Sequence, residues 1–339
     1  MNLKNYTPFK GMAWESVDAN NQSFVTSLLR LKFKLVKAEG EGEWSLQLLP
    51  DQGELFGADV FYDKEVMGSV KYESDYVPFK VCADLVVNAT AIYAKDMESK
   101  SWYCSVSLYS PTGEKLNALR LNVKGPIRLG FRDAVREVPI RYELAKGGTL
   151  SVKKDEEGKL VAKKIDLYNH AGCGSYPNHE NSKPCSEQIY YSGHSLKVPP
   201  GFGFIHRSWK SRLDLAGTYD KAWIDTQHPL PPDDFNYLHN QAAHPLLMAK
   251  DYIAAGSRVE LENLTREESK IWFTVPEFKL LSRVKSQTDS TMEVLMLDTL
   301  IVDLDEEDDY VVYASYRAYT QVIDTLTEVE LILIKEEEV

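Results

Sequence analysis

Hydrophobic and polar residues alternate with a period of two along most of this chain. In the run 29–35, for example, apolar side chains at the odd positions alternate with Arg and Lys at the even positions. Because successive side chains of a β-strand point to opposite faces, this alternation predicts strands with one face in the core and one in solvent. Helical periodicity is nearly absent. Further strand candidates lie at 44–48, 84–93, 102–109, 119–123, 138–142, 258–261, 271–275, 292–297, 299–303, 310–319 and 327–334.

Turn-forming residues separate most of these runs, which is typical of a sandwich of short strands. We therefore expect a mainly β fold with few short helices, built as two antiparallel β-sandwich-like regions joined by a hairpin and a long, ordered, Gly- and Pro-rich loop segment. We place the boundary before Gly147, which gives an N-terminal β domain at 1–146 and a C-terminal β domain at 147–339. Within the segment 149–165, the turn signal at 155–158 predicts a solvated hairpin.

The loop segment at 199–235 is the densest group of structurally special residues, with three glycines, five prolines and two tryptophans. Proline removes backbone donors and glycine favours turns, so this segment cannot form a regular strand or a long helix. Large aromatic side chains would lose their hydrophobic driving force in water, so we expect an ordered loop that packs through them. Long ordered loops are often functional. The aromatic anchors are Trp209, Tyr219, Trp223 and Phe235.

Two interpretations of these anchors stay open. Trp209 and Trp223 lie among Arg, Lys and Asp residues, a mixture that is typical of protein interfaces. Alternatively, both tryptophans pack the loop onto its own domain.

Composition and charge narrow the class of protein. The chain has 339 residues, of which 43% are hydrophobic, enough to build a core, and its net charge of −12 disfavours nucleic acid as a partner. Four scattered cysteines are too few for a disulfide scaffold and favour a reducing compartment. The chain starts without a signal-peptide pattern and has no apolar run long enough to span a membrane. We therefore expect a cytoplasmic protein with no membrane partner.

The candidate catalytic and metal-binding residues do not form a standard motif. His and Cys side chains close together can bind zinc, but only the first two of the four candidates have the spacing of a structural zinc site, so we expect no metal and no cofactor. The Gly-x-Ser-x-Gly elbow of serine hydrolases does not occur. A hydrolase that uses carboxylates or a His/Cys metal site within 170–235 is one alternative, and a carbohydrate-binding β-sandwich with a flat row of exposed aromatic side chains is another. The metal candidates are His170, Cys173, His179 and Cys185.

Four blocks of sequence carry a resemblance to a known family. They are SDYVPFK at 74–80, VPIRYE at 138–143, the central segment with PGFG at 200–203 and AGTYD at 216–220, and LDT at 297–299 followed by Arg317. With these blocks in this order, the chain resembles the adaptor or chaperone proteins encoded beside VgrG spike, PAAR tip and effector genes in bacterial type VI secretion clusters.

The resemblance implies a non-enzymatic adaptor that binds a cognate effector toxin in the cytoplasm and helps load it onto the VgrG or PAAR spike. Where the family tends to show an Asn-Pro-x-Gly-x-Gly turn, this chain has His170 and Cys173, at positions without metal ligands in the family pattern. The acidic charge further suggests a basic effector, attracted electrostatically. The candidates for partner binding, or for a structural hallmark of the family, are Trp209, Arg212, Tyr219, Asp220, Trp223, Asp234 and Phe235.

Overall fold

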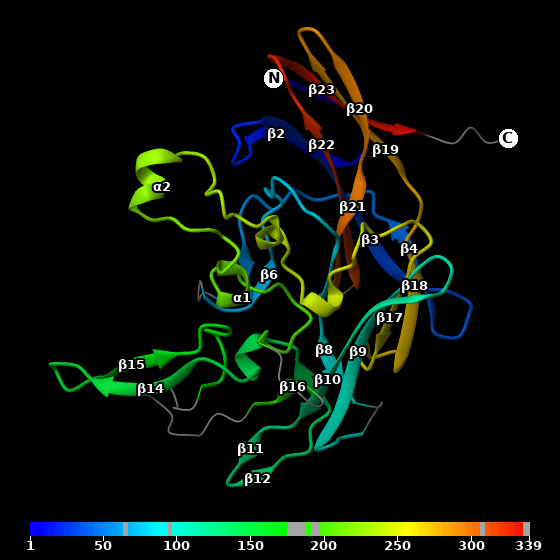
Figure 1. Cartoon of the computed structure of the whole chain (residues 1–339). Helices are drawn as coiled ribbons and strands as arrows, with labels where there is room; N and C mark the ends of the chain where they lie inside the picture. Colours follow the sequence, from blue (N-terminus) through cyan, green and yellow to red (C-terminus); the bar gives the residue numbers. More distant parts are fainter. Residues whose placement is uncertain (64–66, 94–96, 175–186, 192–196, 306–308, 335–339) are drawn as a thin grey trace.

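A computed structural model describes residues 1–63, 67–93, 97–174, 187–191, 197–305 and 309–334 (Figure 1). The prediction of a mainly β protein with few short helices is confirmed, with 46% strand and 7% helix. The strands are β1 (Asn2–Asn5), β2 (Lys10–Val17), β3 (Ser23–Lys37), β4 (Glu43–Leu48), β5 (Val60–Phe61), β6 (Val70–Tyr72), β7 (Asp84–Asn88), β8 (Thr90–Ile92), β9 (Ser101–Tyr109), β10 (Lys115–Lys124), β11 (Ile127–Arg128), β12 (Phe131–Arg132), β13 (Glu137–Pro139), β14 (Thr149–Lys154), β15 (Leu160–Ile165), β16 (Ile189–Tyr191), β17 (Arg258–Glu262), β18 (Lys270–Thr274), β19 (Lys279–Ser286), β20 (Ser290–Val294), β21 (Met296–Asp303), β22 (Val311–Gln321) and β23 (Leu326–Ile334). The helices are α1 (Lys210–Leu213) and α2 (Lys221–Thr226), and the 3-10 turns are η1 (Tyr142–Leu144), η2 (Tyr237–Asn240) and η3 (Pro245–Leu247).

One large curled sheet dominates the fold. Its strand order is β16-β10-β9-β17-β18-β4-β3-β22-β21-β7, and β2 pairs with β3 beside this path. The longest pairing joins β3 to β22 in antiparallel register, from Lys34 opposite Val311 to Phe24 opposite Gln321. Most pairings in this sheet are antiparallel, as expected from the sequence, whereas β7 pairs with β21 and β4 with β18 in parallel.

The two expected domains share this sheet and its core. In this sheet, strands from before residue 147 neighbour strands from after it at five places: β10 with β16, β9 with β17, β4 with β18, β3 with β22, and β7 with β21. A single hydrophobic cluster contains Leu29 and Val106 together with Leu261 and Val312. A boundary at 146/147 therefore does not separate two sheets, since alternation along a strand says nothing about which strand becomes its neighbour.

The interior of β3 also departs from the predicted alternation. Residues 25–31 are all buried, and they include Arg30, which the pattern placed on the solvent face. The Arg30 guanidinium donates to the Asp75 carboxylate at 2.6 Å, which explains how a charge is kept inside the protein. Burial lowers the pKa of Arg30 from its ordinary value.

Smaller elements extend from the large sheet. A second sheet has the order β1-β23-β19-β20, and β14 pairs with β15 as the predicted hairpin with its turn at 155–158. Figure 1 shows the hairpins β14–β15 and β11–β12 extending from the lower part of the molecule, and α2 projecting from one side of the upper part. Among the described residues, none of the helices is long and apolar enough to cross a membrane.

Candidate partner-binding site

The central segment enters the core through its turn at 199–203. Gly201 lies against the aromatic ring of Tyr142, and a Cβ at this position would overlap that ring, so the close approach requires glycine. Phe202 is fully buried, and its carbonyl accepts a hydrogen bond from the backbone N–H of Val87 in β7 at 2.9 Å. The segment is thus anchored to the large sheet where it begins.

Trp209 is the next anchor, and it is fully buried. It packs in a small second cluster with Tyr142 and Ile205, and its ring meets the Tyr142 ring edge-on at a centroid distance of 5.0 Å. Because its side chain is enclosed by its own chain, Trp209 packs the loop onto its own domain and is not available to a partner.

Arg212 is buried and fastens three segments to one another. Its Nη1 donates to Glu73 Oε1 at 2.8 Å and to the carbonyl of Ile205 at 2.8 Å. Its Nε and Nη2 both donate to the carbonyl of His239, at 3.0 and 2.9 Å. Burying a charge is favourable only when it is paired and hydrogen-bonded, as it is here. Arg212 therefore holds the central segment in place.

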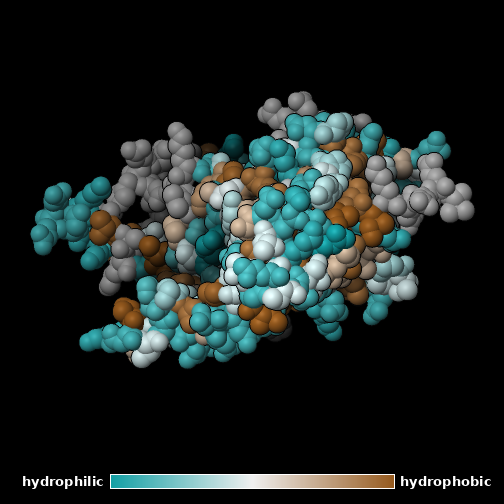
Figure 2. All heavy atoms as spheres, turned by 90° about the horizontal axis from the view of Figure 1, so that it is seen from above, coloured by the Kyte–Doolittle hydropathy of each residue, from teal (hydrophilic) through white to brown (hydrophobic). Residues whose placement is uncertain are grey.

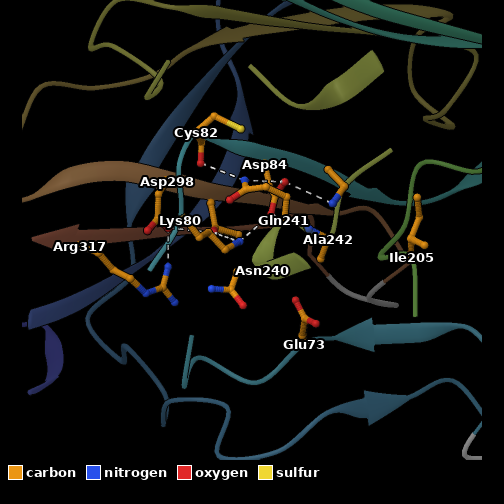
Figure 3. Close-up of polar contacts among 12 residues, drawn as sticks. Glu73, Lys80, Cys82, Asp84, Ile205, Asn240, Gln241, Ala242, Asp298 and Arg317 are labelled. Carbon is orange, nitrogen blue, oxygen red and sulfur yellow. Dashed lines mark hydrogen bonds and ion pairs between the residues drawn. The ribbon is translucent and has the colours of Figure 1, made fainter. Parts of the chain in front are cut away.

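A second buried ion pair lies beneath the stretch that follows the central segment (Figure 3). Lys80 Nζ donates to Asp84 Oδ2 at 2.6 Å and to Thr299 Oγ1 at 2.8 Å. Asp84 also accepts from the backbone N–H of Ala242 at 2.9 Å and from Gln241 Nε2 at 3.2 Å. Both charged side chains are almost completely buried. The only sequence signal for this pair was its place in and just after the block 74–80.

Another buried ion pair joins the last block of resemblance to the first. Arg317 pairs with Asp298 and donates from Nη2 to the carbonyl of Asp75 at 2.9 Å. The side chain of Asp75 in turn forms the buried ion pair with Arg30. The residues that carry the resemblance in these blocks thus form an internal framework of buried charges.

Beyond Arg212 the chain forms a projecting unit at 214–236, which we call the α2 lobe. Its neck is closed by a hydrogen bond from the Asn236 N–H to the Leu215 carbonyl at 3.0 Å. Asp220 caps α2 by accepting from the Trp223 N–H at 2.9 Å. Asp234 accepts from the N–H and hydroxyl of Thr218 at 2.8 and 2.7 Å, and these bonds lower the pKa of its carboxyl group. Asp220 and Asp234 therefore shape the lobe.

The aromatic side chains of the lobe pack mainly on one another. The Trp223 ring lies edge-on to Tyr219 at 4.7 Å and to His228 at 5.2 Å, and its Nε1 donates to the Leu230 carbonyl at 3.0 Å. Phe235 packs at the neck, against rings of the η2 turn. No residue of α2 itself is buried. Tyr219 and Ile224 expose 55% and 61% of their surface, so the outer side of the lobe presents apolar groups to solvent.

An aromatic groove lies beside the lobe, next to the β2–β3 turn. The two are neighbours because Gln227 Nε2 of the lobe donates to the carbonyl of Ala19 in this turn at 2.9 Å. The groove has a volume of about 290 Å³. Burial and the charge of Asp18 raise the pKa of Tyr237. The residues that line the groove are Asp18, Gln22, Ser23, Phe24, Phe79, Tyr237, Tyr319 and Gln321.

The structure places two of the four metal-binding candidates that the sequence suggested. Within the described parts of the chain, no group of three or more His, Cys, Asp or Glu side chains could hold a metal ion. His170 and Cys173 lie in a turn that packs on Gly147-Gly148, where a Cβ on Gly148 would overlap the Gly172 carbonyl. The other two metal candidates, His179 and Cys185, lie outside the described residues.

Comparison with known protein families shows to which family this chain belongs. Residues 20–314 match a family model described as "Uncharacterized protein conserved in bacteria (DUF2169)". The chain belongs to this family. The DUF2169 match includes the α2 lobe, the buried ion pairs Arg212–Glu73 and Lys80–Asp84, and strands from both sides of residue 147. No curated protein and no solved structure matches the chain.

Proposed function

We propose that this DUF2169 protein is a non-enzymatic adaptor that binds a cognate type VI secretion effector in the cytoplasm and helps load it onto the VgrG or PAAR spike. The observation that carries the proposal is the α2 lobe, an exposed apolar projection whose base is fixed by the buried Arg212–Glu73 ion pair. The resemblance of the four sequence blocks to type VI adaptors supports the class of partner.

The lobe has the properties of a preformed protein-binding element. Exposed aromatic and aliphatic side chains are common anchors of protein interfaces, and Tyr219 and Ile224 are of this kind. The Arg212–Glu73 ion pair and the closed neck order the lobe before a partner arrives. A preordered surface loses less conformational entropy on binding, which favours affinity.

Charge supports a basic partner. The net charge of −12 would steer a positively charged effector toward the adaptor and raise the association rate at low salt. The association rate constant should therefore fall as ionic strength rises, because surface charges are screened. Association that is indifferent to salt would remove this part of the proposal.

The test is calorimetric titration of the purified protein with the toxin encoded beside it. We expect a 1:1 complex that the double variant Tyr219→Ser/Ile224→Ser weakens at least about tenfold, the loss of roughly 1.4 kcal/mol. The matched control is Leu116→Ser, which removes an exposed leucine from β10. A wild-type protein that binds neither the toxin nor the spike proteins would overturn the proposal. Equal affinity of the double variant and the control would exclude the lobe as the site.

A further inference from the structure

The hairpin β11–β12 carries a leucine in an unfavourable backbone conformation. Its turn consists of Leu129 and Gly130, with φ values of 50° and 82°. Positive φ at both central residues is the geometry of a type I′ turn, for which Asn-Gly is the preferred pair. In the left-handed region the Cβ of leucine comes too close to the backbone, so a bulky side chain here is an outlier.

The same leucine is almost completely surrounded by solvent. Leu129 exposes 99% of its surface, and Phe131, two residues later, exposes 78%. The hairpin points away from the rest of the molecule, so its own core cannot cover these side chains (Figure 1). Backbone strain and apolar exposure both disfavour leucine at this position in the free chain. Together they indicate a tip that is used in contact with another molecule.

The charge around the tip indicates the chemistry of its partner. Arg128 and Arg132 flank the turn, and the side chain of Arg128 is largely exposed, with one ion pair to Asp133 at 3.1 Å. A complementary surface is apolar with carboxylates at its rim. A lipid bilayer fits less well, because two apolar side chains anchor less than a single acyl chain does.

The protein itself presents a surface of this chemistry at its opposite end. The groove beside the β2–β3 turn has aromatic walls and Asp18 at its edge. Its volume of about 290 Å³ is at the lower limit for ligand pockets, roughly 300–1,000 Å³, and suits side chains better than a cofactor. Val322 N–H donates to the Ser23 carbonyl of the groove, and the next residue, Ile323, is almost fully exposed.

Figure 2 shows the hydropathy of the surface seen from above. Polar residues cover most of this face, with apolar residues in small groups between them (Figure 2). The hairpin tip lies at the lower end of the molecule and the β2–β3 turn in its upper part (Figure 1). One copy therefore cannot place its tip in its own groove.

We propose that the β11–β12 tip of one copy docks into the aromatic groove of a second copy. Leu129 and Phe131 enter the groove, and Arg128 lies near Asp18. This contact does not rest on the adaptor function. It joins two different surfaces, so repetition gives rings or open chains of copies rather than a symmetric dimer. Because the contact area is small, association is weak and depends on protein concentration.

Sedimentation velocity over roughly two decades of protein concentration, up to about 1 mM, tests the contact. The tip variant is Leu129→Asn, which supplies the preferred Asn-Gly turn and keeps the fold. The groove variant is Asp18→Asn/Gln22→Arg, which replaces the attraction for Arg128 by repulsion. We expect the wild-type protein to associate, and each variant to do so at least about tenfold more weakly, while Leu116→Ser associates like the wild type.

Mixing the two variants gives the decisive result. The tip variant keeps an intact groove and the groove variant keeps an intact tip, so we expect a 1:1 complex that does not grow further. A wild-type protein that is monomeric throughout would overturn the proposal, as would variants that associate normally or a mixture without a complex. Tip-dependent binding to anionic vesicles or to an effector, without association between copies, would assign the tip to that occupant and also overturn it.

Discussion

The buried ion pair between Arg212 and Glu73 makes the sharpest prediction about stability. Replacing Arg212 by Met removes the Nη1–Oε1 contact of 2.8 Å and leaves two backbone carbonyls, those of Ile205 and His239, without this donor. Breaking a buried pair by removing one partner costs about 3–5 kcal/mol, because the other charge stays buried. In a chain of this length 1 kcal/mol shifts Tm by roughly 2 °C, so we expect Tm to fall by about 6–10 °C.

A matched control is available in the same cluster. Arg207 also approaches Glu73, at 3.2 Å, but 46% of its side chain is exposed. Exposed ion pairs contribute about 0–1 kcal/mol, so Arg207→Met should change the free energy of unfolding by no more than that. Urea unfolding followed by circular dichroism measures both variants.

The double variant Arg212→Met/Glu73→Gln sharpens the comparison. Removing the Glu73 carboxylate, which has lost its buried partner and keeps the half-exposed Arg207, should restore part of the stability that Arg212→Met loses, since Arg212 and Glu73 act as one unit. If Arg212→Met were no more destabilising than Arg207→Met, or if the double variant were the least stable of the three, the reasoning from burial would be refuted.

Three further changes test single features of the fold. Gly201→Ala should lower Tm by several degrees because its Cβ would overlap Tyr142, whereas Gly57→Ala, with open space around it, should leave Tm nearly unchanged in the same thermal scan. Burial lowers the pKa of His244 to about 4, below the unfolded value of about 6.5, so stability should fall by roughly 3 kcal/mol as pH drops from 6.5 to 4; His244→Asn should flatten this dependence in urea titrations at several pH values. Asp220→Ala should cost about 1 kcal/mol and speed amide exchange in α2, while Asp220→Asn, which keeps the cap, should not.

Local rules account for part of the candidate site. Asp220 precedes a short helix and accepts from the N–H three residues later, which is ordinary capping and readable from sequence. Trp209 could be recognised as an anchor because a large aromatic residue in an ordered loop must pack somewhere. The sequence could not show whether Trp209 packs in the core or at an interface, because it packs against the Tyr142 ring, which comes from a turn far away in the chain.

Other residues of the site had no local signal. Lys80 and Asp84 are four residues apart, a spacing that is common for charged pairs on solvated surfaces. Their burial follows from β7, β21 and the chain near Ala242 closing around them. The strained turn at Leu129 could not be predicted from the sequence either, because Leu-Gly is not a preferred pair for a type I′ turn.

The sequence by itself determined that this protein is mainly β, where most strands run, that the hairpin turns at 155–158, and that the segment 199–235 is an ordered loop. These features depend on side-chain periodicity and turn chemistry, which act over a few residues. Only the tertiary structure decided the strand order across residue 147, the parallel pairs, the burial of Arg30 and the division of the loop into a buried anchor and a projecting lobe. These depend on which distant segments become neighbours, and alternation along a strand is the same whichever neighbour it acquires.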